Sequence, residues 1–429
     1  AKKLMERMLC RLLHKQKFIE FSAQELISLS ALRGVSVREL LPEMEGSYSS
    51  DYDLAEAAAN KVKKSPILKV QLPLAVAQYV VSRSVCVEKF VRLIGEGSTL
   101  EDLLEDCLRR VSDDAEVRNM IAQETTFAFE IDVIYGKIDK PEQREIIDRF
   151  AVLPFAGKVA MKEPERKFVV IRDLRALDKW YFGLQVAHTR EGSKRWYNRY
   201  MLTKREYLGP TSTDTELAIL MVNQAQVVPG SIILDPFCGT GSILVAAAHF
   251  KALCFGCDID MRVLRGWSVG RSTSDSPGNI FTNFDVYGLE YPEIIRNDVS
   301  LNIWRQEGLF DAVICDPPYG IRAGSRKKTT RSENSTETYE SRNAILDLLD
   351  FSAKVLRVGG RLVYLLPTDR DVYDIRDIPV HPDLRLVANS ENLLSSRISR
   401  RLITLEKIGG EGGVTQGGEF LTSVKDKYY

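Results

Sequence analysis

The chain has 429 residues, too many for one compact core and enough for two or three domains. It is 44% hydrophobic and 28% charged, which is typical of globular proteins, and no uncharged apolar run is long enough to span a membrane. Lys plus Arg and Asp plus Glu both number 59, so the net charge is zero and any nucleic-acid surface must be a local patch. The seven Cys lack a disulfide-like spacing, which favours reduced thiols, and we expect a cytoplasmic protein.

Residues 1–72 predict a small α/β unit. Residues 18–21 are expected to end a strand, and Ser22 with Glu25 three residues later predicts a helix that starts with a capping box. The apolar residues after this cap recur at helical spacing: Leu26, Leu29 and Leu32. A second apolar run follows over residues 67–81.

Residues 73–187 predict a second α/β unit. Apolar or alternating runs favour four strands, over residues 85–87, 127–135, 167–171 and 181–186. Two further stretches have helical spacing: residues 99–111 and residues 141–153. Pro141 suits the first turn of the second helix.

Residues 188–210 form a basic, aromatic linker. Its basic residues are Arg190, Lys194, Arg195, Arg199, Lys204 and Arg205. They interleave with the aromatic residues Trp196, Tyr197, Tyr200 and Tyr207. Such interleaving suits phosphates and bases, so the basic residues are candidates for RNA binding. A solvated connector whose aromatic residues pack on neighbouring elements is an equally good interpretation.

Residues 211–407 alternate strands and helices, which predicts an α/β, doubly wound, Rossmann-like sheet with ligand sites at the carboxyl ends of its strands. The expected strands are residues 231–235, 252–258, 293–297, 311–315 and 361–366. A final pair, residues 385–388 and 401–406, predicts an antiparallel hairpin at the edge of the sheet. The polar residues 325–343 predict a mobile loop, and the glycine-rich residues 408–429 predict a disordered tail.

The first chemical motif is the turn at residues 235–241, between a buried strand and a helix. Gly239 and Gly241 allow positive φ and close approach of a ligand, and Asp235 can accept hydrogen bonds from a bound ammonium. Pro236 and Phe237 complete this candidate cofactor loop. The turn lacks the third glycine of a dinucleotide fingerprint, so NAD fits less well than the zwitterionic S-adenosylmethionine. A tight turn without a ligand is the alternative.

Two later acids are candidates for the same cofactor. Asp258 closes the next strand and is expected to accept from ribose hydroxyls, with Asp260 as a weaker candidate. Asp298 follows the third strand and is placed to accept from an adenine amino group, although a surface turn competes as an explanation. Cys254 and Cys257 form a CxxC, but they face opposite sides of a strand and no second pair is near, so no metal site is expected.

Asp316, Pro317, Pro318 and Tyr319 follow a buried apolar strand and form the second motif. An exocyclic amine of a nucleobase is a poor nucleophile because its lone pair is delocalised into the ring. The Asp316 carboxylate and the Pro317 carbonyl can accept its hydrogens, the proline pair fixes the turn, and Tyr319 can stack on an extruded base. Catalysis would then rest on positioning and charge compensation, which predicts an amino-methyltransferase that uses S-adenosylmethionine.

Three segments carry a resemblance to a known family: residues 210–213, 235–241 and 316–322. They resemble the tRNA guanosine-10 N2-methyltransferases, more closely their eukaryotic catalytic subunit, over the chain up to about residue 407. The resemblance implies a ferredoxin-like domain at residues 1–72 and a THUMP domain at residues 73–187, which bind tRNA, and a methyltransferase domain at residues 211–407.

The resemblance also implies individual roles and a partner. Thr213 would lie near the methionine carboxylate of the cofactor, and Arg322 would contact RNA. A small zinc-containing activator subunit would cover an apolar strand edge of the catalytic domain. The sequence departs from the family pattern at two places. Cys238 stands where many relatives carry Ala or another small residue, and residues 260–298 differ from the Asn-rich helix that is usual there, which weakens the case for Asp298.

Three functions therefore compete. The first is a tRNA guanine N2-methyltransferase, and the second is a ribosomal RNA or DNA amino-methyltransferase with the same catalytic core. The third is an inactive RNA-binding scaffold, which the intact residues 316–319 disfavour. The α/β pattern before the catalytic core favours the first, because it resembles an RNA-binding THUMP unit.

Overall fold

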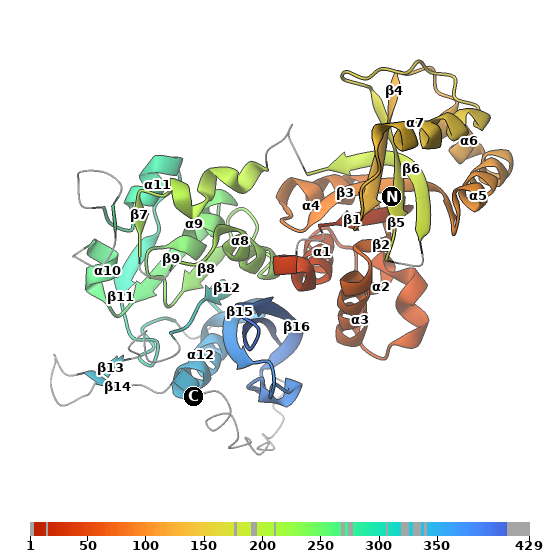
Figure 1. Cartoon of the computed structure of the whole chain (residues 1–429). Coiled ribbons are helices and arrows are strands. Elements are labelled where there is room, and N and C mark those ends of the chain that lie inside the picture. The colour runs from red at the N-terminus through yellow and green to blue at the C-terminus, as the bar shows by residue number, and fades with distance from the viewer. Residues whose placement is uncertain are drawn as a thin grey trace. The chain divides into compact units, whose positions relative to one another are not determined.

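A computed structural model describes residues 4–13, 16–175, 178–189, 195–209, 212–266, 271–272, 278–305, 308–318, 326–328, 336–338 and 341–409. The chain divides into two compact units, Ala1–Arg190 (unit 1) and Glu191–Tyr429 (unit 2), each with its own sheet (Figure 1). Within the described ranges, no helix is both long enough and apolar enough to cross a membrane. Nearly all of the predicted disordered tail lies outside these ranges.

Unit 1 is built on a six-stranded mixed sheet in the order β2-β1-β3-β6-β5-β4. Its strands are β1 (Glu6–Leu12), β2 (Ile67–Leu72), β3 (Val87–Gly97), β4 (Phe127–Ile134), β5 (Arg166–Asp173) and β6 (Lys179–His188). Only β4 and β5 pair in parallel. Because β1 pairs with β3, strands from both predicted N-terminal domains share one sheet, and their division at residue 72 stays a prediction.

Helices cover the sheet of unit 1. They are α1 (Ser22–Ala31), α2 (Val37–Leu40), α3 (Asp51–Lys64), α4 (Leu74–Arg83), α5 (Leu100–Asp113), α6 (Ala115–Ile121) and α7 (Lys140–Arg149), with the 3-10 turns η1 (Gln16–Phe21), η2 (Pro42–Ser47) and η3 (Phe150–Val152). Alternation along β1 divides its side chains between two cores: Met8 and Cys10 pack against the first helices, and Leu9 packs with Ile134 of β4.

Two predictions at the start of unit 1 are wrong. Residues 18–21 belong to the 3-10 turn η1 instead of a strand, and Ser22 does not cap α1. The Glu25 carboxylate is fully buried and accepts hydrogen bonds from Ser84 Oγ and from the N–H groups of Val85 and Cys86. Glu25 therefore ties α1 to the segment that enters β3, a task that a local capping pattern does not reveal.

Unit 2 is built on a seven-stranded sheet in the order β11-β9-β8-β12-β15-β17-β16. Its strands are β8 (Ile232–Asp235), β9 (Leu253–Asp258), β11 (Glu293–Arg296), β12 (Phe310–Cys315), β15 (Leu356–Asp369), β16 (Leu384–Leu393) and β17 (Ile398–Lys407). The first five are parallel, as in a doubly wound α/β fold. The predicted hairpin β16–β17 forms, but β17 inserts between β15 and β16, so only β16 lies at the edge.

The helices of unit 2 lie on both faces of this sheet. The longest are α8 (Thr215–Gln224), α9 (Ser242–His249) and α12 (Ser341–Val355). The shorter elements are α10 (Met261–Arg265), α11 (Thr282–Tyr287), η4 (Trp196–Tyr200), η5 (Leu202–Lys204), η6 (Ile375–Asp377), β7 (Tyr207–Leu208), β10 (Arg271–Ser272), β13 (Arg326–Lys328) and β14 (Thr336–Thr338). α8 packs on α9 and β15, whereas Leu348 of α12 packs with Leu362 and Tyr364 in a core on one face of the sheet.

Residues 325–343 were expected to form a loop, and the structure describes only part of this segment. β13 and β14 pair with each other there as a small antiparallel ladder. The rest of the expected loop before Ser341 lies outside the described residues.

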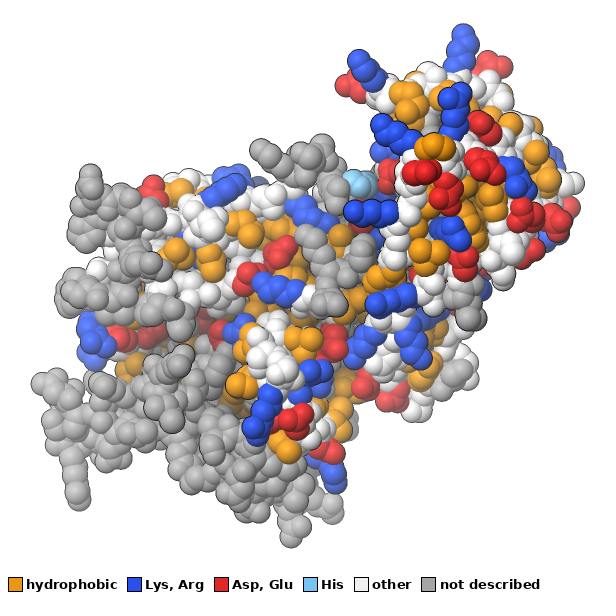
Figure 2. Space-filling view, viewed as in Figure 1, with side chains coloured by type: hydrophobic (Ala, Val, Ile, Leu, Met, Phe, Trp, Pro, Cys, Tyr) orange, Lys and Arg blue, Asp and Glu red, His pale blue; other side chains and the backbone are white. Residues whose placement is uncertain are grey.

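Charged side chains of both signs occur on one face of the molecule. Figure 2 shows basic and acidic side chains interspersed on the face in view, without one large region of a single sign. This pattern agrees with a net charge of zero. Any attraction for a polyanion on this face must therefore come from a few local residues.

Candidate active site

Four carboxylates lie at one edge of the sheet of unit 2. Asp235 ends β8, Asp258 ends β9, Asp298 comes shortly after β11 and Asp316 directly follows β12. These strands are parallel neighbours, so their carboxyl ends share an edge. The chain order also reverses between β8 and β12, and open α/β sheets bind ligands at this kind of switch point. The predicted motifs are therefore brought together by topology.

The turn at residues 235–241 is anchored to the end of β9. Cys238 N–H donates to the Cys257 carbonyl at 2.8 Å, and Gly239 N–H donates to Asp258 Oδ2 at 3.0 Å. Gly239 and Gly241 have φ of +50° and +81°, left-handed values that favour glycine. Gly241 precedes the first residue of α9, so the turn passes directly into a helix as predicted.

The glycines differ in their surroundings. Among the described residues, a Cβ at Gly239 would meet no atom within 4 Å, whereas a Cβ at Gly241 would lie 3.1 Å from Ile280 Cγ1. Gly239 thus leaves open space beside the backbone at the site edge. Gly241 is needed for packing against α11 and the residues before it.

The carboxylates of this edge repel one another. Burial raises the pKa of Asp235 well above its ordinary value, and the nearby carboxylates of Asp258 and Asp316 raise it further, against one hydrogen bond from Phe237 N–H. Burial also raises the pKa of Asp258, although the N–H groups of Asp260 and Gly239 oppose that shift. A cationic ligand would relieve this repulsion and a phosphate would add to it. These carboxylates therefore suit the positively charged sulfonium and ammonium groups of S-adenosylmethionine.

Asp235 and Asp258 also shape the protein itself. Asp235, which was predicted to accept hydrogen bonds from a bound ammonium, is only 1% exposed, and one of its carboxylate oxygens accepts from Phe237 N–H. Asp258 accepts from Gly239 N–H and, at 2.9 Å, from Asp260 N–H. Asp260 instead caps α10 by accepting from Arg262 N–H. Of the two, Asp258 is the acid that contacts the turn.

Asp298 is part of a local turn. Its Oδ1 atom accepts from Ser300 N–H at 3.0 Å and from Ser300 Oγ at 2.8 Å, and its carbonyl accepts from Leu301 N–H. These contacts are those of the surface-turn explanation. The role of Asp298 toward an adenine ring stays a prediction.

The segment before α8 contacts the turn. Ser212 Oγ lies 3.2 Å from Thr240 Oγ1, so residues 212–214 are joined to the candidate cofactor loop. Thr213 follows Ser212, and Asp214 caps α8 by accepting from the N–H groups at positions 216 and 217. Thr213 therefore lies at the N-terminal end of α8, where an anionic group is favoured.

Asp316 is held by a residue that the sequence did not single out. Its Oδ2 atom lies 3.3 Å from Arg400 Nη1, and Arg400 comes 84 residues later, near the start of β17. The side chains of Arg400 and Asp316 are only 16% and 22% exposed. Pro317 is buried and Pro318 is partly buried, whereas Tyr319 lies outside the described residues.

The aromatic residues of the linker pack on unit 2. The Trp196 and His249 rings stack with centroids 4.5 Å apart, and Tyr200 Oη lies 2.8 Å from His249 Nδ1. Tyr197 Oη donates to Glu216 of α8. These contacts join the linker to α8 and α9, as expected of a packed connector.

Arg205 was predicted to contact RNA, but its burial contradicts this prediction. It is 2% exposed, and its guanidinium donates to Ser242 Oγ at 2.6 Å and to the Tyr200 carbonyl at 3.3 Å. Burial lowers its pKa. An RNA cannot reach this guanidinium, so Arg205 is a structural residue beneath the start of α9.

The other predicted RNA contacts differ in position. Arg199 and Lys204 are exposed, and Arg199 also donates to the Tyr287 carbonyl at 3.2 Å. Arg195 is partly exposed beside the Tyr197 ring. The remaining three lie outside the described residues: Arg190, Lys194 and Arg322.

Cys254 and Cys257 are buried thiols on β9. Cys254 Sγ contacts the Leu244 carbonyl of α9, whereas Cys257 packs in the core that contains Phe310 and α12. Burial raises the pKa of each to about 12, so both thiols stay protonated near neutral pH. Among the residues that the structure describes, no group of three His, Cys, Asp or Glu side chains is arranged to hold a metal.

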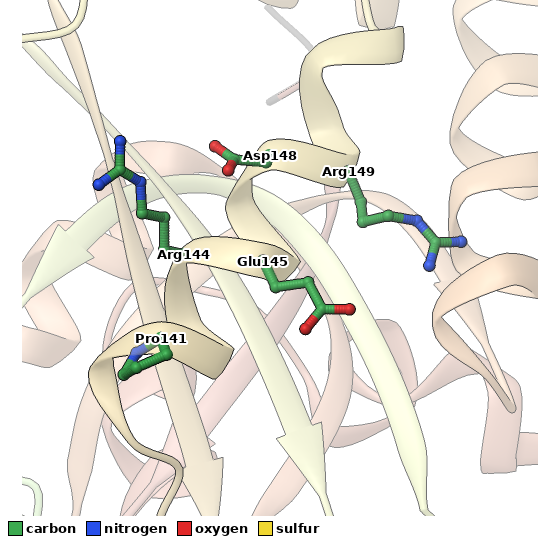
Figure 3. Close-up of a pocket in the computed structure, with 5 residues that line it drawn as sticks. All are labelled: Pro141, Arg144, Glu145, Asp148 and Arg149. Atoms are coloured by element: carbon green, nitrogen blue, oxygen red, sulfur yellow. The ribbon is translucent and has the colours of Figure 1, made fainter.

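A shallow hollow occurs in unit 1, the unit that contains none of these motifs. It lies on α7 and is lined by Pro141, Arg144, Glu145, Asp148 and Arg149 (Figure 3). Arg144 and Arg149 point to opposite sides of the helix, and Arg149 pairs with Glu101. The charged groups do not converge on one point, so the hollow does not resemble a ligand site.

Known protein families match segments of both units. A family model for the Tmrp11 THUMP N-terminal domain matches residues 8–200, and one for the RMKL-like methyltransferase domain matches residues 203–267. The chain is 34% identical to the tRNA (guanine(10)-N(2))-methyltransferase TRMT11 of Gallus gallus, over 92% of this chain and 87% of that protein. The corresponding protein of Homo sapiens is 33% identical, over 92% and 88% of the two chains. Against the crystal structure of TrmN from Thermus thermophilus the TM-score is 0.42, at 18% identity over 94% of this chain and 100% of that one.

Proposed function

The chain belongs to the tRNA (guanine(10)-N(2))-methyltransferase family, and from this premise we propose that it transfers a methyl group from S-adenosylmethionine to the exocyclic N2 of guanosine 10 in tRNA. The observation that carries the proposal is the position of Asp316. Its carboxylate follows β12 at the switch point of the sheet, beside Asp235 and Asp258. One edge thus combines an acceptor for an amine with an anionic environment for a sulfonium.

S-adenosylmethionine, when bound, would supply an electrophilic methyl group on a sulfonium. The protein's task is then to aim the lone pair of N2 at this methyl group. Asp316 and the Pro317 carbonyl accept the two amine hydrogens, which draws the nitrogen away from conjugation with the ring. The carboxylate also stabilises the positive charge that develops on N2 and can take up the released proton.

The residues proposed to hold the cofactor surround the turn at residues 235–241. The open space at Gly239 allows close approach, and Asp258 lies beside it. Thr213, at the N-terminal end of α8, is proposed to contact the methionine carboxylate, because a helix N-terminus favours an anion. Asp298 is proposed to accept from the adenine amino group.

Unit 1 is proposed to bind the tRNA, and the match of its sequence to a THUMP N-terminal domain supports this assignment. Arg195, Arg199 and Lys204 would add phosphate contacts near the catalytic unit. Arg190, Lys194 and Arg322 stay predictions of the same kind. Tyr319 is proposed to stack on the target base.

A small zinc-binding activator is proposed as the partner of unit 2, at the β11 edge of the sheet. In the described part of unit 2, β11 pairs with β9 alone, and Tyr291, Leu301 and Ile303 near it are more than half exposed. An open strand edge with apolar neighbours is unfavourable in water and suits a covering subunit. The described cysteines are all free and buried, which fits the proposed cytoplasmic location.

The test is methyl transfer from labelled S-adenosylmethionine to unmodified tRNA, with and without the activator, followed by nucleoside analysis. The proposal predicts N2-methylguanosine, formed only when the activator is present. Ribosomal RNA and DNA serve as competing substrates in parallel reactions. Label in either of them but not in tRNA would retain the methyltransferase and reject the substrate.

A further inference from the structure

Arg400 lies at the catalytic edge although no sequence motif contains it. Its Nη1 atom is 3.3 Å from Asp316 Oδ2, which is the distance of a direct ion pair. β17 runs antiparallel to β15, so its first residues lie at the same edge as the last residues of the parallel strands. The insertion of β17 between β15 and β16 is therefore what brings Arg400 to Asp316.

We propose that Arg400 is a positioning residue for methyl transfer: it holds the Asp316 carboxylate in the orientation that accepts the hydrogens of the target amine. The inference rests on the function proposed above and adds a residue to it. Arg400 would act through Asp316 without touching the base. Its absence should therefore slow the chemical step and leave substrate binding nearly unchanged.

The backbone of Arg400 is well fixed. The residue lies opposite Pro367 of β15 and Asn392 of β16, so strands hold it on both sides. Its side chain is mostly buried, which limits the number of orientations open to the guanidinium. A planar guanidinium held from a central strand can fix a carboxylate more closely than an exposed Lys on a loop.

Asn392 adds support from the neighbouring strand. It is 2% exposed and directly opposite Arg400 in the antiparallel pairing, so both side chains point to the same face of the sheet. Its Oδ1 atom is buried and accepts no hydrogen bond from the residues that the structure describes. A buried acceptor at this position favours a cationic neighbour, because an unsatisfied carbonyl group is costly.

The charges of the site explain why a cation is needed there. Asp258 and Asp316 each lie close enough to Asp235 for their negative charges to act on its carboxyl. A carboxylate among other carboxylates tends to turn away or take up a proton, and either change would end its use as an acceptor for an amine. Arg400 offsets this repulsion at the carboxylate that the reaction uses.

Arg401 provides a matched control on the same strand. It points to the opposite face from Arg400, with its guanidinium 3.9 Å from the centre of the Tyr373 ring and one nitrogen 3.4 Å from Asn389 Oδ1. Arg401→Gln removes one guanidinium from the same strand without touching Asp316. Loss of packing or of net charge in general would therefore appear in both variants.

The experiment compares the wild-type chain, Arg400→Gln, Arg400→Lys and Arg401→Gln, each with the activator, on unmodified tRNA. For Arg400→Gln we expect kcat to fall about 10- to 100-fold, as for a misplaced catalytic group, while KM for tRNA and Kd for S-adenosylmethionine stay within about threefold. Arg400→Lys should recover part of kcat because it keeps the charge. Arg401→Gln should retain the wild-type kcat.

A double-mutant cycle tests the route of the effect. In an Asp316→Asn background, Arg400→Gln should lower the remaining rate by less than about threefold, since the carboxylate that it positions is gone. Equal losses in both backgrounds would overturn the inference, as would an Arg400→Gln enzyme as active as Arg401→Gln.

If Arg400→Gln does not fold, Arg400→Lys decides: a reduced kcat with unchanged KM supports the inference, and an unchanged kcat overturns it. A wild-type complex without activity on tRNA would instead reject the proposed function, and this inference with it.

Discussion

Asp235, Asp258 and Asp316 occupy one edge of a sheet, yet each has a different environment. Asp235 is buried where the turn begins, Asp258 accepts hydrogen bonds from two backbone N–H groups, and Asp316 pairs with Arg400. Only Asp316 is both partly exposed and next to a cation. These differences separate Asp316, the acid proposed to meet the substrate, from the two acids at the turn that is proposed to hold the cofactor.

Replacement of Asp316 should separate chemistry from binding. We expect Asp316→Ala to lower methyl transfer at least about 100-fold, because the amine loses its acceptor and the developing charge its counterion. Cofactor affinity, measured by calorimetry, should remain within about threefold. Asp371→Ala, at an exposed acid of the same unit, should retain activity. Methyl transfer at wild-type rates by Asp316→Ala would disprove the assigned role.

Asp258→Ala is the complementary variant. It removes the acceptor for Gly239 N–H and thus loosens the turn that is proposed to hold the cofactor. Its Kd for S-adenosylmethionine should rise about tenfold or more, as for the loss of a hydrogen bond to a charged group. At saturating cofactor most of kcat should return. A variant with wild-type Kd would remove Asp258 from the cofactor site.

The raised pKa of Asp235 has a consequence for stability. A carboxyl whose pKa is raised by folding binds its proton more tightly in the native state than in the unfolded chain. The free energy of unfolding therefore falls as pH rises from the ordinary pKa of 3.8 through the native pKa. Asp235→Asn removes this contribution, and its side-chain oxygen can still accept from Phe237 N–H.

Denaturant unfolding at several pH values between about 4 and about 7 measures the effect. The wild-type free energy of unfolding should decline more steeply with rising pH than that of Asp235→Asn. The two curves should approach each other toward the acidic end, where the carboxyl of the unfolded chain also begins to take up its proton. Parallel curves would mean that Asp235 titrates alike in the folded and unfolded chain.

At the scale of elements, the turn at residues 235–241 separates two glycine roles. Gly241→Ala should reduce the free energy of unfolding by about 2 kcal/mol, because its φ of +81° is strained for alanine and its Cβ would crowd Ile280. Gly239→Ala should cost about 1 kcal/mol, from backbone strain alone. Gly239→Ala should nevertheless impair cofactor binding, because its methyl group fills the open space. Denaturant unfolding that gave the reverse order of stability would contradict these roles.

Glu25 links two elements of unit 1. Glu25→Ala removes a buried charged acceptor from Ser84 Oγ and from the N–H groups of Val85 and Cys86, although Cys86 N–H keeps its hydrogen bond to Ser84 Oγ. We expect a loss of about 3 kcal/mol or more in the free energy of unfolding. Glu20→Ala, at a less buried acid just before α1 that pairs with Lys63, should cost less than about 1 kcal/mol. Similar losses for both variants would contradict the role of Glu25.

Sequence patterns predicted the strands of the seven-stranded sheet of unit 2, most of which contain an apolar run, but they did not predict β7, β10, β13 or β14. They missed β1, where Arg7 and Arg11 interrupt the apolar run. Arg11 is nonetheless buried and pairs with Asp132 of β4, a partner 121 residues away. Burial alone would raise the pKa of Asp132, but Arg11 and Lys89 outweigh it and hold that pKa below its ordinary value. A buried charge of this kind is explained only by its tertiary partner.

In the candidate site, too, residues set by local sequence pattern could be predicted and residues set by tertiary contacts could not. Asp235, Asp258 and Asp316 could be predicted because each follows its strand, and parallel strands bring their ends together. Arg400 could not, since the insertion of β17 depends on strand order instead of local pattern. Arg205 was a candidate RNA contact because it lies in a basic, aromatic segment. Its burial beneath the start of α9 makes it a structural residue instead.

At the scale of the whole molecule, the chain combines two units with separate sheets and separate cores. Unit 1 matches a THUMP N-terminal domain, and unit 2 holds the acids proposed for catalysis. On the face that Figure 2 shows, charges of both signs are interspersed, which fits recognition of tRNA by local contacts. Substrate choice is thus proposed to arise in unit 1, and choice of the reacting atom in unit 2.

The most direct measurement compares two tRNAs that differ by one amino group. The chain and its activator would be given labelled S-adenosylmethionine and a tRNA with guanosine at position 10, or the same tRNA with inosine there, which lacks the exocyclic amine. We expect label in the first tRNA, recovered as N2-methylguanosine, and none in the second. Equal labelling of both would show that the methyl group goes to another atom, and would contradict the assignment of N2 of guanosine 10 as the acceptor.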